Sequence, residues 1–195
     1  MEVAVVDYKG GNVRSVLFAL ERLGIRATLT ADAEVLRRAD KVLFPGEGEA
    51  ASAMQALRAA GLVEVLPTLT QPFLGICLGM QLLGQHSAEN DTELLGLLPF
   101  RVQRFANNPT YKVPHMGWNT LESLQGPLFA GVSAGDHVYF VHSYYAPVGD
   151  YTLAESAHAA AFSAAVQCRN FYGVQFHVEK SSAVGLRILQ NFLSL

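Results

Sequence analysis

The 195-residue sequence has few of the features that mark disulfide-rich, metal-binding or membrane proteins. It has two cysteines, Cys77 and Cys168, and they form neither a disulfide framework nor a metal-type spacing. Charged residues make up 16% of the chain and the net charge is −3, which argues against nucleic acid or an anionic membrane as a partner. No apolar segment approaches the roughly 18–20 residues of a membrane span, and no basic region with an apolar signal core begins the chain. We expect a soluble cytoplasmic protein.

Apolar residues are abundant instead and make up half of the sequence. This fraction favours a packed core, and the length is ordinary for one domain. No repeat, low-complexity stretch or linker divides the chain, so we expect residues 1–195 to form a single domain.

The first half alternates predicted strands and helices. We expect strands at 3–6, 26–29, 41–44 and 73–76, and helices at 13–23, 34–38, 50–60 and 63–69. Repeated βα units of this kind form a parallel sheet with right-handed crossovers. Ligands of such open sheets bind at the carboxyl ends of the strands.

The second half is predicted to be mostly extended, with turn-rich connections such as 107–109. We expect strands at 97–104, 117–121, 137–141, 152–156, 162–167 and 171–175, and one helix at 183–193. These strands either extend the same sheet or form a smaller sheet packed on it. The predicted fold class is therefore α/β, with an open, mostly parallel central sheet flanked by helices and an added antiparallel portion.

Residues 73–81, Phe-Leu-Gly-Ile-Cys-Leu-Gly-Met-Gln, are the most informative segment. Cys77 ends a predicted strand, lies between Gly75 and Gly79, and directly precedes a predicted helix. This is the layout of a nucleophile elbow, a sharp turn that lifts one side chain above the sheet. A helix N-terminus there favours a thiolate and a developing oxyanion. A cysteine in an apolar run is more often part of the core, which is how we interpret Cys168.

The candidate base lies a hundred residues further on, in the segment Gln-Phe-His-Val-Glu-Lys at 175–180. In an extended chain His177 and Glu179 project from the same face, so the carboxylate can orient one imidazole nitrogen. A strand-end histidine is usually structural, but the elbow and the His-x-Glu pair together favour catalysis. Such triads are assembled by the fold and not by sequence order.

These two motifs resemble those of the class I, or triad, glutamine amidotransferases. Within that family the chain is similar, over nearly its whole length and in order, to the glutaminase subunits of imidazole glycerol phosphate synthase, from histidine biosynthesis. The more specific resemblance comes from four segments: Asp-Tyr-Lys-Gly-Gly-Asn-Val-Arg-Ser-Val at 7–16, Pro-Gly-Glu-Gly at 45–48, Pro-His-Met-Gly-Trp-Asn at 114–119 and Tyr-Phe-Val-His-Ser-Tyr at 139–144.

The resemblance implies an enzyme that hydrolyses glutamine to glutamate and ammonia, with a Cys77–His177–Glu179 triad and neither cofactor nor metal. The oxyanion would bind the amide of Leu78 and the loop formed by Gly46, Glu47 and Gly48. Glutamine would be held by Gln81, His142, Ser143 and Tyr144.

The resemblance also implies a heterodimer with a cyclase subunit, a (β/α)₈ barrel. Ammonia would be channelled to the cyclase, which forms imidazole glycerol phosphate and an aminoimidazole carboxamide ribotide. We expect the chain alone to be nearly inactive. The positions implied to face the cyclase are Asn12, Met116, Trp118, Asn119, Tyr139 and Lys180. Taken alone, the single tryptophan would more often be a core anchor.

Two positions depart from the family pattern. Glu47 stands where the family usually has a small apolar residue, and we expect its carboxylate to point to solvent or to the partner. Val178 replaces a proline, and we expect it to continue an extended segment. Two alternatives stay open: a self-sufficient cysteine hydrolase, and a catalytically silent regulatory subunit. The related glutaminase of pyridoxal phosphate synthesis normally has alanine at the position of Leu78 and a different oxyanion loop.

Overall fold

A computed structural model describes residues 1–10, 12–107 and 109–195 of the chain. Gly11 of the 7–16 segment and Asn108 of the 107–109 turn lie outside the described residues.

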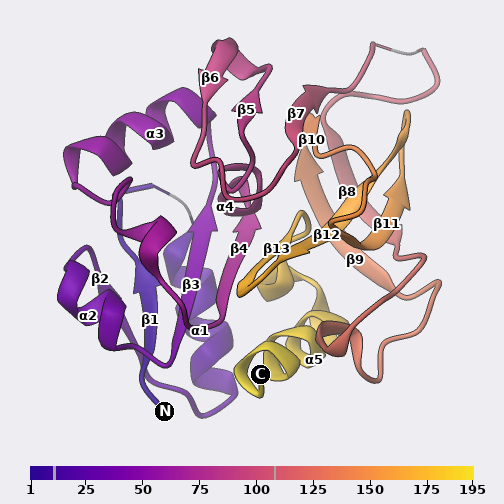
Figure 1. Cartoon of the computed structure of the whole chain (residues 1–195). Helices are drawn as coiled ribbons and strands as arrows, with labels where there is room; N and C mark the ends of the chain where they lie inside the picture. The colour runs from indigo at the N-terminus through magenta and orange to yellow at the C-terminus, as the bar shows by residue number, and fades with distance from the viewer. Residues whose placement is uncertain (11, 108) are drawn as a thin grey trace.

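Seven strands form the central sheet, in the order β11-β12-β13-β4-β3-β1-β2 (Figure 1). Five neighbours, from β13 to β2, pair in parallel, and β12 and β11 extend the sheet antiparallel. The strands are β1 (Val3–Val6), β2 (Ala27–Thr30), β3 (Lys41–Gly46), β4 (Phe73–Cys77), β11 (Thr152–Ala157), β12 (Ala161–Cys168) and β13 (Phe171–Val174). The predicted fold class is confirmed.

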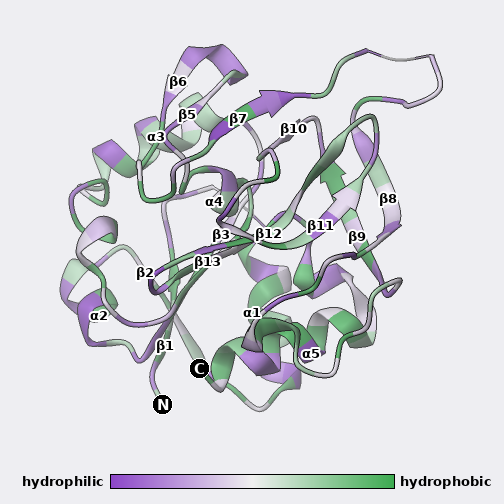
Figure 2. Cartoon of the chain, turned by 45° about the vertical axis from the view of Figure 1, so that its right-hand side comes forward, coloured by the Kyte–Doolittle hydropathy of each residue, from purple (hydrophilic) through white to green (hydrophobic). Residues whose placement is uncertain are grey.

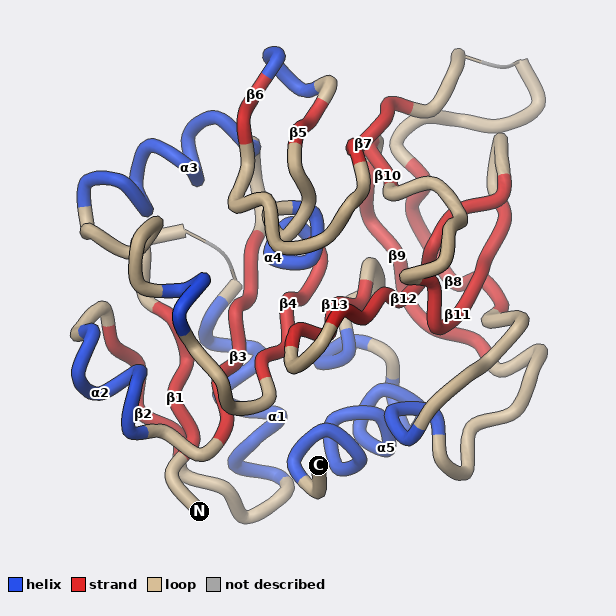
Figure 3. The backbone as a smooth tube through the Cα atoms, in the orientation of Figure 1, coloured by secondary structure: helices blue, strands red, loops and turns tan. Residues whose placement is uncertain are grey.

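Helices cover both faces of this sheet (Figure 3). On one face α1 (Val13–Arg22) and α5 (Ser182–Leu193) bury their apolar stripes, and on the other face lie α2 (Ala33–Arg38) and α3 (Ala50–Ala59). Figure 2 shows apolar residues concentrated in the central strands and in α1 and α5. Helix α1 ends where Gly24 adopts a φ of +75°, a conformation that glycine reaches without strain.

Two smaller sheets complete the second half, so both arrangements that the sequence left open are present. One has the order β10-β7-β5-β6, and the other is the antiparallel pair β8–β9. Their bounds are β5 (His86–Ser87), β6 (Thr92–Glu93), β7 (Arg101–Arg104), β8 (His115–Thr120), β9 (His137–His142) and β10 (Tyr144–Tyr145). The β8–β9 pair packs through Val138 and Phe140 into the same core as α1 and α5.

Two predicted elements are wrong. The expected helix at 63–69 is only a three-residue 3₁₀ turn, η1 (Leu66–Thr68), and Pro67 within it has no amide to continue a helix. The expected strand at 97–104 is reduced to β7, because Pro99 precedes it and Leu97 and Leu98 are buried without pairing in a ladder. The two-residue strands β5, β6 and β10 were too short to predict from periodicity.

Candidate active site

Cys77 lies at the junction of β4 and the four-residue helix α4 (Leu78–Gln81). Its φ of 56° and ψ of −112° fall in a region that non-glycine residues rarely adopt. Gly46, the last residue of β3, pairs directly with Cys77 across the sheet, so the loop 46–48 begins beside the thiol. The elbow expected from the sequence is therefore present, with the candidate oxyanion loop next to it.

The glycines around the elbow let α4 lie directly on the sheet. A Cβ atom on Gly79 would stand 1.9 Å from the carbonyl oxygen of Phe44, and one on Gly75 would stand 2.6 Å from that of Gly79. Both distances are to backbone atoms and are shorter than real Cβ contacts allow, so the backbone itself would have to shift. The two glycines that bracket Cys77 are thus required by packing as well as by the turn.

His177 and Glu179 lie beside the elbow, beyond the end of β13. The Nδ1 atom of His177 is 2.8 Å from Oε1 of Glu179, and both side chains are buried. Because Glu179 occupies Nδ1, the other ring nitrogen, Nε2, is left for the cavity that His177 and Cys77 both line. The arrangement matches that of a nucleophile, a base and an orienting carboxylate.

The electrostatics of this group favour a protonated imidazole. Burial lowers the pKa of His177, but hydrogen bonds and charge interactions with Cys77 and Glu179 outweigh it and raise the pKa to about 10. The second carboxylate oxygen of Glu179, Oε2, is buried with no hydrogen-bond partner among the described residues. The charge of Glu179 is therefore compensated chiefly by His177, which stabilises an imidazolium beside the thiol.

The segment after His177 is not extended, so that prediction was wrong. Val178–Lys180 form a 3₁₀ turn, η4, and the turn, not strand geometry, brings Glu179 back to His177. Val178 is the first residue of this turn and is 1% exposed. A proline would be pre-organised at such a position, which accounts for the family's preference.

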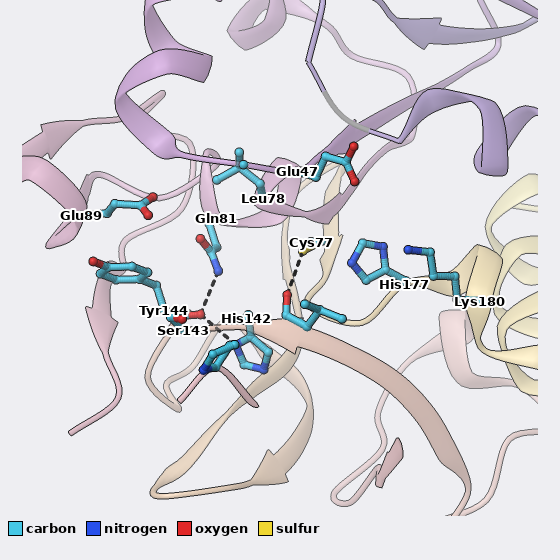
Figure 4. A pocket seen from close by; sticks show the side chains of 13 residues that line it. Glu47, Cys77, Leu78, Gln81, Glu89, His142, Ser143, Tyr144, His177 and Lys180 are labelled. Atoms are coloured by element: carbon cyan, nitrogen blue, oxygen red, sulfur yellow. Dashed lines mark hydrogen bonds between the residues drawn. The ribbon is translucent and has the colours of Figure 1, made fainter. Parts of the chain in front are cut away.

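Cys77 and His177 border a cavity of about 290 Å³ between the central sheet and the β8–β9 pair (Figure 4). Its lining brings together the predicted catalytic and glutamine-binding residues except Gly46 and Glu179. Gly46 pairs with Cys77 across the sheet, and Glu179 contacts His177. The lining residues are Glu47, Gly48, Cys77, Leu78, Gln81, Glu89, Pro114, Val141, His142, Ser143, Tyr144, His177 and Lys180.

Two buried side-chain amides link the elbow helix α4, which ends at Gln81, to Tyr144 and Gln175. Gln81 donates from Nε2 to the carbonyl oxygen of Tyr144 at 2.8 Å and to Oε1 of Gln175 at 3.0 Å. Nε2 of Gln175 in turn lies 3.9 Å from the sulfur of Cys77. Sequence reasoning assigned no role to Gln175, which is 0% exposed; the available signal was its position between the apolar residues Val174 and Phe176.

His142 has a different environment from His177. Its Nδ1 is 2.8 Å from the carbonyl oxygen of Tyr144, and its Nε2 is 3.0 Å from Nδ1 of His115. Burial lowers the pKa of His142 to about 3, with a hydrogen bond to Tyr144 acting in the opposite sense and nearby histidines adding to the decrease. Burial and His158 lower the pKa of His115 to about 4. Both rings are neutral near pH 7.

Glu47 and Glu89 place carboxylates on the cavity lining, and only the first was noted from the sequence. Glu47 is exposed and lies on the side of the cavity where Cys77 and His177 lie (Figure 4). Glu89 accepts a hydrogen bond from the amide of Ala50 at 2.8 Å. Burial raises the pKa of Glu89, and the charge of Glu49 adds to the increase, whereas the bond from Ala50 lowers it. Glu89 lies in η2 (Glu89–Asp91), a segment without periodicity that sequence reasoning could not connect to the site.

The predicted partner-facing residues divide into two groups. Met116 and Trp118 are 63% and 53% exposed on one face of β8, and the ring of Trp118 lies 5.9 Å from that of Tyr139. Asn119 faces the other way and bonds within the chain, to the carbonyl of Ala157 and to His115. The exposed aromatic pair and Met116 have the composition typical of interface anchors.

Asn12 and Lys180 lie on neighbouring elements, since α1 packs against η4. Asn12 precedes α1 and accepts a hydrogen bond from the hydroxyl of Ser15 at 2.9 Å. Lys180 is exposed and lines the cavity. Their side chains therefore stand near the rim of the candidate site.

The described residues contain no cluster of three or more histidine, cysteine or acidic side chains placed to hold a metal ion. Within the same residues, no helix combines the length and the apolar character needed to cross a membrane.

Comparison with known proteins agrees with the geometry. The family model "Glutamine amidotransferase class-I" matches residues 4–195. Similar proteins include the imidazole glycerol phosphate synthase subunit HisH of Bacteroides thetaiotaomicron, 52% identical with all of both chains covered. HisH 2 of Legionella pneumophila (strain Paris) is 49% identical, with 99% of this chain and 98% of the relative covered.

Solved structures show the same fold at lower identity. A structure described as glutamine amidotransferase has a TM-score of 0.77 at 21% identity and covers 98% of this chain and 97% of its own. PurLQS from Thermotoga maritima has a TM-score of 0.74 at 18% identity, with 99% and 97% covered. On the family match and the full-length identities, the chain belongs to the class I glutamine amidotransferases and, within them, to the HisH branch of imidazole glycerol phosphate synthase subunits.

Proposed function

We propose that the chain is the glutaminase subunit of an imidazole glycerol phosphate synthase, with the whole chain acting as one glutaminase domain. The observation that carries the proposal is that Cys77 and His177 line a cavity of about 290 Å³, with Glu179 held against His177. The identity of about half of all residues to HisH proteins supports the choice of reaction.

The reaction begins with the thiolate of Cys77, which attacks the side-chain amide carbon of glutamine. The developing oxyanion is bound by the backbone amide of Leu78 and by an amide of the 46–48 loop. Donors of this kind are typically worth about 3–4 kcal/mol of barrier each. The raised pKa of His177 means that its proton is present before substrate binds and is given to the leaving nitrogen as ammonia forms.

The second half of the reaction regenerates the enzyme. Neutral His177 removes a proton from water, and the resulting hydroxide attacks the γ-glutamyl thioester and releases glutamate and the thiolate. Glu179 holds the Nδ1 proton of the imidazole throughout, so Nε2 always faces the reacting atoms.

The charges on the cavity lining suit glutamine. Its amide reaches Cys77, and Glu89 supplies a carboxylate on the lining for the α-ammonium group. Ser143 and Tyr144 border the same space, whereas the side-chain amide nitrogen of Gln81 is already bonded to protein acceptors. Gln81 therefore acts on the substrate by holding the wall and by its remaining oxygen.

The ammonia passes to a cyclase partner with a (β/α)₈ barrel, in a cytoplasmic heterodimer. Exposed Met116 and Trp118, paired with Tyr139, supply an apolar contact surface. Asn12 and Lys180 supply polar contacts near the cavity rim, and a thiol nucleophile requires a reducing compartment.

The test is glutamate release from glutamine, measured for the purified chain alone and with the cognate cyclase and its nucleotide ligand. We expect almost no release by the chain alone and a large increase in the complex. Full activity without the cyclase would identify a self-sufficient hydrolase, and no activity in either case would identify a silent regulatory subunit. Either result overturns the proposal.

A further inference from the structure

A continuous hydrogen-bond chain runs from β8 to the cavity through two buried imidazoles. Asn119 Nδ2 lies 3.3 Å from His115 Nε2, and His115 Nδ1 lies 3.0 Å from His142 Nε2. His142 Nδ1 then lies 2.8 Å from the carbonyl oxygen of Tyr144, which also accepts from Gln81. Through Gln175, the same network reaches the sulfur of Cys77.

The direction of every bond in this chain is fixed by its two ends. The Tyr144 carbonyl can only accept, so His142 Nδ1 carries the proton and Nε2 of the neutral ring accepts. His115 must then donate from Nδ1 and accept at Nε2.

The other end agrees with this assignment. Asn119 Oδ1 accepts from the amide of Thr120 at 2.8 Å, and its Nδ2 donates to the carbonyl of Ala157 at 2.8 Å. The amide orientation of Asn119 is therefore determined independently of the histidines, and it presents a donor to His115. Only one tautomer of each ring satisfies all the partners.

The packing holds both rings in one orientation. The ring of His115 stacks between Phe140, at 4.9 Å and 24°, and His158, at 4.3 Å and 18°. The ring of His142 lies 5.0 Å from that of Phe162. The imidazoles cannot turn to exchange donor and acceptor without disrupting this cluster.

We propose that His115 is a positioning residue for glutamine hydrolysis. It donates to Nε2 of His142 and so holds the ring that donates to the Tyr144 carbonyl, which in turn accepts from the Gln81 amide on the cavity wall. The inference rests on the proposed glutaminase function and assigns no contact between His115 and the substrate. Its effect is on how well the cavity is pre-shaped for glutamine, so the KM is expected to change more than the kcat.

The main test compares His115→Phe with wild type in the complex with the cyclase. Phenylalanine keeps the ring stack and removes the hydrogen bonds, so we expect the KM for glutamine to rise about tenfold, the scale of losing one supporting hydrogen bond, with kcat changed less than about threefold. Nitrogen NMR of the His142 ring in the free chain should show Nδ1 protonated in both proteins, because the Tyr144 carbonyl still accepts from it, whereas the Nε2 resonance should lose its hydrogen-bonded shift in the variant.

Matched variants separate positioning from packing. His158→Phe changes the same stack but leaves the chain of bonds intact, and should keep the wild-type KM and His142 Nε2 resonance. His115→Asn retains a donor near the position of Nδ1 and should recover most of the affinity. Asn119→Asp replaces the donor to His115 Nε2 by an acceptor and should raise the KM even if His115→Phe does not fold.

A folded His115→Phe or Asn119→Asp variant with the wild-type KM would overturn this inference, as would a His142 Nε2 resonance in His115→Phe that is unchanged from wild type. The outcome is distinct from failure of the proposed function, which is tested by glutamate release from the wild-type complex. If wild type releases glutamate and the variants match it, only the role of His115 is lost.

Discussion

Two histidines on the same cavity have opposite charge states. His177 and His142 are each 5% exposed, yet the pKa of His177 is raised to about 10 and that of His142 is lowered to about 3. Burial acts on both in the same direction, so it cannot explain the difference. The partners can: a thiol and a carboxylate face His177, whereas a carbonyl and a second imidazole face His142.

The two sides of the cavity therefore differ in function: one carries charge for proton transfer, and the other holds a neutral imidazole for hydrogen bonding. On the central-sheet side, charge is concentrated for proton transfer at Cys77. On the β8–β9 side, the imidazole is kept neutral so that it can donate and accept at once. A protonated His142 would lose its acceptor nitrogen and with it the bond from His115.

The largest expected effect comes from removing the nucleophile. Cys77→Ser should lower glutamine hydrolysis by at least about 10⁴-fold, the scale seen when a triad nucleophile is removed. It should also lower the pKa of His177, because interactions with Cys77 are among the causes that raise it. Glutamate release in the complex measures the first effect, while cyclase activity with free ammonia should be unchanged.

Cys168→Ser is the matched control, since Cys168 lies at the end of β12 away from the cavity lining. Wild-type glutamate release is expected from it. Normal glutamine turnover by Cys77→Ser would contradict the assignment of the nucleophile.

Glu179→Gln tests what makes His177 differ from His142. The amide keeps an acceptor for Nδ1 but removes the charge, so the pKa of His177 should fall toward the range of His142. We expect kcat to fall about 10²- to 10⁴-fold, as when other orienting carboxylates are neutralised. An NMR titration of the His177 ring reports the change in its pKa, and an unaltered titration would contradict the account.

The pH dependence of the free energy of unfolding should reflect both the lowered and the raised histidine pKa values. As pH falls below about 6.5, the unfolded chain binds protons that folded His115 and His142 exclude, so each lowers the free energy of unfolding by up to about 1.4 kcal/mol per pH unit. The stabilisation from His177 has the opposite sign: it is fully present below about pH 6.5 and is lost as pH rises toward 10.

Urea unfolding between roughly pH 4.5 and 6 isolates the contribution of His115 and His142, because that of His177 is constant there. His115→Phe should make the acid dependence shallower by up to about 1.4 kcal/mol per pH unit. An identical slope in wild type and variant would mean that the buried rings do not resist protonation.

The smallest effect is expected at Glu47, which borders the charged side of the cavity. A carboxylate near a developing oxyanion raises the barrier, but Glu47 is exposed and solvent screens it. Glu47→Gln should therefore increase kcat in the complex by only about two- to fivefold, less at high salt. Decreased turnover would indicate that the carboxylate assists the reaction.

The elbow and the parallel half of the fold could be predicted because their determinants are local. Gly75 and Gly79 around Cys77 specify one turn, and alternation of apolar strands and amphipathic helices specifies βα units. The contact between His177 and Glu179 was also expected, although the 3₁₀ turn that produces it was not.

The opposite wall could not be predicted because it depends on pairing across the chain. His115 faces His142 only because β8 and β9 pair in a register that sets these residues opposite each other. Similarly, the inward direction of Asn119 follows from strand alternation once that register is known. Nothing within a few residues of His115 indicates that its ring is a neutral donor in a chain of five polar groups.

The single tryptophan allows binding to this protein to be followed by intrinsic fluorescence. Trp118 is the only indole in the sequence, stands 53% exposed beside Tyr139 and Met116, and lies on the opposite face of β8 from the histidine chain. Its emission therefore originates from one known patch of surface, with no second fluorophore of its kind to subtract. A docking protein that covers β8 and β9 will shift this emission to the blue, so association can be titrated on the unlabelled, unmodified chain.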